Sequence, residues 1–231
     1  MAFDVHVGLF LCAEDGSGLE RRERLLAEVN ATLRELGKPA HREPRALAEI
    51  DPPLAPATDP CLLGARLGFY GSDKYRRLAA FARYLAVHGT VAPADHPDDA
   101  VTEQRYDGLP DRRPLFDHVI AIVTGQATIV LPQLFDQVVW GAAGSVEHGP
   151  IVSAQRLRIE SVALGYALRY VDSRTHDWIS GSVLDDSPFT HLDARIEDDA
   201  EQAWADEADL CHRLLSVATD VLRTGALGVA G

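Results

Sequence analysis

The stretch HVIAIVTGQATIVLP, residues 118–132, decides how the fold is interpreted. It joins two almost continuous apolar runs, 116–123 and 127–131, through a short polar tip. Apolar runs of this length that are rich in Val and Ile are typical of strands covered on both faces. Gly125 and Gln126 at the tip suit a type II′ turn, which takes glycine at its first position. The stretch therefore predicts a buried hairpin, with the polar tip acting only as a turn.

Outside this stretch, four segments repeat apolar residues at helical spacing. We predict helices in these segments: 17–36, 72–89, 153–170 and 198–224. Ser153 is expected to cap the third helix, while a strand near 156–164 is the alternative there because Gly165 weakens a helix. The apolar residues of 3–12 predict a buried first strand, and 135–140 predicts a short edge strand.

The remaining segments, 38–68, 90–114 and 172–198, are rich in proline or in polar and acidic residues, and they predict long surface loops. The sequence has no internal repeat and no strong compositional break that would mark a linker. We therefore expect residues 1–231 to form a single α+β domain. Its mainly antiparallel sheet is expected to have the 116–131 hairpin at its centre, with helices packed across it.

The chain is acidic, with 35 acidic and 22 basic residues and a formal net charge of −13. This balance argues against direct binding to a phosphate backbone, which needs clustered Lys and Arg. No run of about 18 apolar residues is present, and the N-terminus lacks the basic and apolar regions of a signal peptide. The three cysteines are widely spaced, which fits a reducing compartment. We therefore expect a cytoplasmic protein whose partners include neither nucleic acid nor membrane.

The sequence lacks the motifs of common catalytic and metal sites. Nine histidines occur without an H-E-x-x-H pattern, and neither a C-x-x-C pair nor a G-x-S-x-G elbow is present. Cys12 and Cys211 fall in predicted core positions, where thiols are unreactive, and Cys61 lies in a proline-rich loop without an activating neighbour. We expect no metal and no cofactor, and the sequence favours a binding protein over an enzyme.

A small-ligand pocket is the alternative interpretation. The segment GFYGSDKYRR, 68–77, places Ser72 at a glycine-flanked helix start, where backbone N–H groups can hold an anion. Tyr70 lies beside it in the sequence, and His118 opens the predicted hairpin. These three residues would then line the pocket. The competing interpretation makes Ser72 an ordinary helix cap and His118 a hydrogen-bonded core residue.

The segment with the strongest single sign of charge is 185–209, where Arg195 is the only basic residue among ten acidic ones. We call this segment the acidic run. An acidic surface attracts basic proteins and speeds their association, although a solvated face without a partner has the same composition. The candidate partner-binding residues lie toward its end: Asp198, Asp199, Asp206 and Glu207.

The order of several segments resembles a group of uncharacterised small cytosolic bacterial proteins. The resemblance covers residues 3–170 and rests on DVHVGLF, GFYGSDKYRRLAAFARYL, FDHVIAI…IVLPQLFDQVVW and SAQRLRIESVAL. In that group we expect a His-rich, acid-bearing segment between the hairpin strands and a Gly-Ser-Ser helix cap. This chain has Thr124-Gly125-Gln126 at the first place and Val152-Ser153-Ala154 at the second. Some proteins of this general kind are immunity proteins that neutralise toxins.

These observations lead to one functional hypothesis and one main alternative, beside a third interpretation as a structural subunit of a larger assembly, which predicts a large exposed apolar patch. The hypothesis is an immunity-like or regulatory protein that neutralises a basic protein partner, such as a toxin, through the acidic run. The alternative is a small-ligand-binding protein or an enzyme with its pocket near His118 and the Ser72 helix start.

Overall fold

The computed structural model describes residues 2–11, 18–54, 59–69, 73–93, 100–108, 115–125, 128–140, 149–168 and 204–230. Within these ranges the helices are α1 (Leu19–Glu35), α2 (Asp73–His88), α3 (Ala100–Asp107), α4 (Asp117–Thr124), α5 (Ala154–Ala167) and α8 (Ala205–Thr224). The strands are β1 (Ala2–Val7), β2 (Gly64–Phe69), β3 (Thr128–Leu131), β4 (Ile151–Ser153) and β5 (Gly228–Ala230). Two short 3-10 helices are η1 (Leu47–Glu49) and η2 (Pro60–Leu62).

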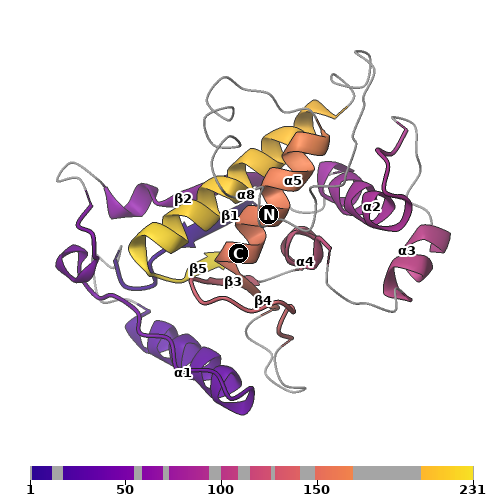
Figure 1. Ribbon diagram of the computed structural model, residues 1–231. Coiled ribbons are helices and arrows are strands. Elements are labelled where there is room, and N and C mark those ends of the chain that lie inside the picture. Colours follow the sequence, from indigo (N-terminus) through magenta and orange to yellow (C-terminus); the bar gives the residue numbers. More distant parts are fainter. Residues whose placement is uncertain are drawn as a thin grey trace.

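The five strands form one sheet in the order β2-β1-β5-β3-β4 (Figure 1). β1 pairs with β2 and β5 in antiparallel fashion, and β5 pairs with β3 in the same way. Only the pair of β3 and β4 is parallel. β5 comes last in the sequence and lies between the first strand and β3, so the two halves of the sheet meet only through the C-terminal end of the chain.

Gly228 makes the close packing around β5 possible. It pairs with Val7 on one side and with Val130 on the other. A Cβ atom at this position would lie 3.2 Å from a side-chain atom of Val221, 3.3 Å from one of Val130 and 3.4 Å from one of Val5. The α8 helix and the sheet therefore approach each other here more closely than a larger residue would allow.

Helices cover both faces of the sheet. α1 lies on one face, where Val29 and Leu33 pack with Ile129 and Leu131 (Figure 1). α2, α4, α5 and α8 lie on the other face, where Val130 belongs to the larger core. The alternation of 129, 130 and 131 between the faces follows from the two-residue period of a strand. The expected α+β class with a mainly antiparallel sheet is confirmed.

The predicted 116–131 hairpin is wrong in its first half, because residues 117–124 form the helix α4. The β-branched residues of this segment favour strands when they are judged locally. Phe116, which precedes the helix, has a φ of 69° and gives it no side-chain cap. The cap comes from far along the chain, since Oε2 of Glu160 accepts a hydrogen bond of 3.0 Å from the backbone N–H of Val119. β3 consequently pairs with β4 and β5 instead of with 116–123.

The other predicted elements were recovered to different degrees. The four helices are confirmed in their described parts, and Ser153 caps α5 by accepting from the N–H of Arg156 at 3.4 Å, so no strand forms at 156–164. The predicted loop 38–68 contains both 3-10 helices and most of β2, and the predicted loop 90–114 contains α3. The predicted edge strand 135–140 is reduced to a single bridge between Val139 and Ile151. None of the helices in the described ranges is long and apolar enough to cross a membrane.

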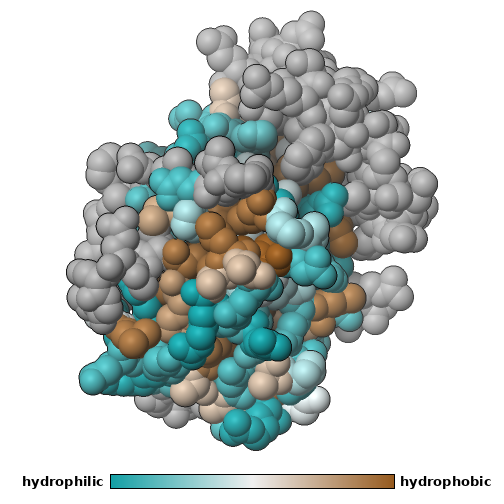
Figure 2. Space-filling model, turned by 90° about the vertical axis from the view of Figure 1, so that its left-hand side faces the viewer, coloured by the Kyte–Doolittle hydropathy of each residue, from teal (hydrophilic) through white to brown (hydrophobic). Residues whose placement is uncertain are grey.

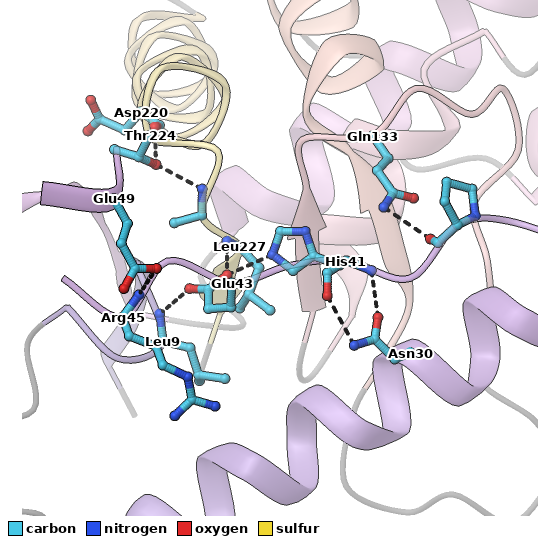
Figure 3. Close-up of polar contacts among 12 residues, drawn as sticks. Leu9, Asn30, His41, Glu43, Arg45, Glu49, Gln133, Asp220, Thr224 and Leu227 are labelled. Carbon is cyan, nitrogen blue, oxygen red and sulfur yellow. Dashed lines mark hydrogen bonds and ion pairs between the residues drawn. The ribbon is translucent and has the colours of Figure 1, made fainter. Parts of the chain in front are cut away.

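The buried carboxylate of Glu43 connects three parts of the fold (Figure 3). Its Oε1 accepts from the backbone N–H of Leu9 at 2.7 Å, just after β1. Its Oε2 accepts from the backbone N–H of Leu227 at 2.8 Å, just before β5, and lies 2.7 Å from Nε2 of His41. The His41 backbone in turn exchanges two hydrogen bonds with the Asn30 side chain of α1, at 2.6 and 3.1 Å. Glu43 thus joins the ends of two paired strands and links them to α1.

We expect Glu43→Gln to destabilise the protein. The glutamine amide has a single carbonyl oxygen, which can accept from only one of the two backbone N–H groups. Its NH₂ then faces the second N–H, and this buried donor is left unsatisfied. The expected loss is about 2–3 kcal/mol of unfolding free energy. It should appear as a lower denaturant midpoint at constant slope. The exposed Glu49→Gln is the matched control, and an equal midpoint for both variants would show that Glu43 has no such role.

Candidate functional site

His118 is buried in the interior, and both of its ring nitrogens are used by the fold. Nδ1 accepts a hydrogen bond of 3.1 Å from the backbone N–H of Ser153. Nε2 lies 3.3 Å from the backbone carbonyl of Asp136, which requires the hydrogen to be on Nε2. Burial, followed by smaller effects that include the charge of Arg156, lowers the pKa of His118 to about 4. The imidazole is therefore neutral near pH 7.

This arrangement makes His118 a structural residue that joins α4 to β4 and to the 132–140 segment. It is the hydrogen-bonded core histidine of the competing interpretation, and it offers no free nitrogen to a ligand. Tyr70 and Ser72, the other two residues of the expected pocket, lie outside the described residues. Among those that are described, no group of three or more His, Cys, Asp or Glu side chains is placed to hold a metal ion.

A second set of polar groups, half-buried or buried, surrounds the start of α4. The Tyr106 hydroxyl forms a short hydrogen bond with the Asp117 carboxylate and also reaches the carbonyl oxygen of Leu115. Burial, and then Asp117, raise the pKa of Tyr106. Burial also raises the pKa of Glu160 to about 8, against the opposing effects of the Val119 N–H and other nearby groups. Tyr106 and Asp117 satisfy each other, and Glu160 accepts from the Val119 N–H of α4, so we assign these groups to the fold.

The cysteines differ from one another in state. Cys211 is a free, buried thiol whose pKa is raised by burial, in keeping with an unreactive core position. Cys61 is part of a disulfide, which the wide spacing of the cysteines did not predict. Cys12 lies outside the described residues.

The four candidate partner-binding acids are not equivalent. Asp206 is exposed in the first turn of α8. Glu207 is only 1% exposed, and its Oε1 lies 3.1 Å from Nε of Arg77. Burial raises the pKa of Glu207, with Arg77 among the opposing effects. Glu207 therefore faces the core and does not present its carboxylate to a partner. Asp198 and Asp199 lie outside the described residues.

Charge is distributed unevenly along the chain. The described ranges hold nineteen of the 35 acidic residues and seventeen of the 22 basic ones, so they are nearly balanced. The other segments hold sixteen acidic residues and five arginines, and nine of those acids fall within 169–203. The excess negative charge is therefore concentrated outside the described scaffold.

Many acids of the scaffold are also neutralised locally. Surface ion pairs join these residues: Glu23 with Arg45, Asp73 with Arg76, Glu103 with Arg83, Asp209 with Arg213, and Asp220 with Arg223. On the side that Figure 2 shows, hydrophilic residues border an apolar area. The described part of that side is therefore not a continuous polar face.

The decisive comparison is with a family of proteins. A family model described as "Putative DNA-mimic protein" matches residues 1–229. The chain belongs to this family. No curated protein and no solved structure gives a significant match. The concentration of acidic residues on one part of the chain agrees with a family named for its likeness to DNA.

Membership in the DNA-mimic family corrects the functional expectations. An immunity-like protein that neutralises a toxin is not what this family indicates, and neither is a ligand-binding protein or an enzyme with a pocket at His118. The expected partners, a toxin and no nucleic acid, are also contradicted, because the family is described as a DNA mimic, which points to DNA-binding proteins. The sequence signal that did point in this direction was the acidic run, but charge alone does not specify which class of protein is recognised.

The buried imidazole should make stability depend on pH. As pH falls below 6.5, the unfolded chain binds a proton that His118 in the folded state does not take up until about pH 4. The group's contribution to stability is therefore present above pH 6.5 and is lost as pH falls toward 4, by about 3 kcal/mol in total. We expect this component to be absent from His118→Gln when unfolding is measured between pH 4 and 8.

Glu160 makes unfolding free energy depend on pH in the opposite direction, but it does so in both proteins. The difference between wild type and variant therefore reports His118 alone. The exposed His6→Gln variant controls for the loss of an imidazole. If the difference in unfolding free energy between wild type and His118→Gln stays constant from pH 4 to 6.5, the buried, neutral state of His118 is contradicted.

Proposed function

We propose that this protein binds a DNA-binding protein at the surface with which that protein holds the phosphate backbone. Lys and Arg contacts to phosphates supply most of the sequence-independent affinity of DNA-binding proteins. Carboxylates accept the same charge-assisted hydrogen bonds as phosphate oxygens. A protein that presents enough of them at suitable positions competes with DNA for the same surface.

The observation that carries the proposal is the family match over residues 1–229, combined with the uneven charge. A nearly balanced scaffold would make a poor imitation of DNA, which carries about one negative charge per 1.7 Å of its axis. The acidic run supplies the densest negative charge in the chain. We therefore place the proposed contact at Asp198, Asp199 and Asp206. Glu207 is left out because it is buried against Arg77.

Capture from a lysate of the source organism, followed by displacement, tests the proposal. The tagged protein is immobilised, and bound proteins are eluted with duplex DNA in one sample and with a neutral polymer at equal mass in another. We expect DNA-binding proteins to be released by duplex DNA and by about 0.5 M salt, since salt screens such contacts. Capture only of proteins that do not bind DNA, or no release by duplex DNA, would refute the proposal.

Neutralising the proposed contact should weaken binding in a defined way. We expect the triple variant Asp198→Asn, Asp199→Asn, Asp206→Asn to associate with the captured protein about tenfold more slowly at low salt. The slope of log affinity against log salt should fall by about one for each contact removed. Surface plasmon resonance over a salt series measures both quantities.

A second triple variant, which removes the same number of negative charges elsewhere, is the matched control. Glu20→Gln, Glu35→Gln and Asp51→Asn remove the same three charges from exposed positions, two of them on α1 across the sheet from α8 (Figure 1). Equal slowing by the two triple variants would mean that net charge alone acts, and it would rule out a contact localised at 198–206.

A further inference from the structure

Trp204, which directly follows the densest part of the acidic run, is held firmly against α2. The side chain is 2% exposed. The guanidinium carbon of Arg77 lies 4.7 Å from the centre of its ring, and Phe81 meets the ring edge-to-face at 5.0 Å. Arg77 and Phe81 are four residues apart on α2 and so lie on the same face of that helix. Within the described residues the indole N–H has no hydrogen-bond partner, so the ring is held through its face and edge.

Arg77 makes a second contact that supports the first. Its Nε forms the ion pair with Glu207 in the first turn of α8, while the Arg77 side chain itself is 44% exposed. One guanidinium therefore stacks on the residue that precedes α8 and pairs with a carboxylate inside the first turn. Trp204 gives this helix no side-chain cap of its own. Through these two contacts, Arg77 holds the start of α8 against α2.

We propose that Arg77 and Trp204 are positioning residues for the proposed contact with a DNA-binding protein. They hold the start of α8 against α2, and so they set where Asp206, in the first turn of α8, stands relative to α2. This inference rests on the proposed function. Binding is strengthened when groups are already held in the bound arrangement, because less freedom is lost on association. Loosening the tie should therefore weaken binding to a DNA-binding protein even though every acidic side chain is retained.

Substitution of Arg77 separates positioning from charge, because the two effects have opposite signs. Arg77→Gln makes the protein more negative by one charge, which favours association with a surface that binds phosphates. The same change removes the stacking on Trp204 and the pairing with Glu207. Tighter binding by Arg77→Gln would indicate that charge dominates, whereas weaker binding would indicate that positioning dominates.

Arg76→Gln is the matched control for this experiment. Arg76 lies next to Arg77 on α2, its side chain is 70% exposed, and its ion-pair partner is Asp73 on the same helix. The change in net charge is identical. The probe is the DNA-binding protein purified from the capture experiment, and association and dissociation rates are measured by surface plasmon resonance. We expect Arg77→Gln to dissociate about fivefold faster than wild type, and Arg76→Gln to bind equally well or slightly better.

Trp204→Phe leaves the net charge unchanged and keeps a ring beside Phe81. This variant therefore tests the positioning role if Arg77→Gln does not fold. We expect faster dissociation with an unaltered salt slope, since the number of ionic contacts is the same. A lower melting temperature with unchanged dissociation would mean that the residues serve stability alone, and it would overturn the inference. Circular dichroism at the binding temperature confirms that each variant is folded.

The failure of this inference can be told apart from failure of the proposed function. If the acidic triple variant weakens binding while Arg77→Gln behaves as Arg76→Gln does, the positioning role is refuted and the proposed function stands. If the capture yields no DNA-binding protein, the proposed function is refuted and this inference falls with it.

Discussion

The fold depends on the place of β5 between β1 and β3. This three-residue strand joins the first strand of the chain to β3 and β4, and without it the sheet would separate into two pairs. Pairing of so few residues is weak by itself. Two features compensate for this weakness: Gly228 lets α8 pack directly against the strand, and Glu43 holds the residues next to β1 and β5 with one carboxylate.

Three buried glutamates each connect separate elements of the scaffold. Glu43 joins strand ends, Glu160 caps α4 from α5, and Glu207 joins the first turn of α8 to Arg77 of α2. Burial of a carboxylate is costly unless donors or a cation lie beside it. Glu43 and Glu160 accept hydrogen bonds from backbone N–H groups, and Glu207 lies in an ion pair with Arg77. Their acidic side chains therefore belong to the architecture, and they have to be separated from the acids that a partner could contact. Sequence alone does not make this separation, as Glu207 shows.

Local signals predicted the elements that depend on local interactions. α2 and α8 carry apolar stripes and end at glycines, and Ser153 caps α5 through a bond three residues away. The errors occur where the deciding contact is distant. α4 looks like a strand because its cap, Glu160, is 41 residues from Val119, and β5 is too short to show any period. The tie between Arg77 and Trp204 left no sequence signal, because a cation stacking on a ring has no characteristic spacing.

The described scaffold and the other segments differ in charge, and this difference bears on a physical conflict that the proposed imitation of DNA would face. Dense negative charge favours the partner, but it destabilises a compact state through self-repulsion. In this chain, five surface ion pairs and a nearly equal number of acids and bases keep the described scaffold close to neutral. The excess negative charge belongs to segments outside the described ranges. Under the proposed function, the residues that would imitate phosphate are largely distinct from those that stabilise the described scaffold, and Trp204, held by Arg77, is the first described residue after 169–203.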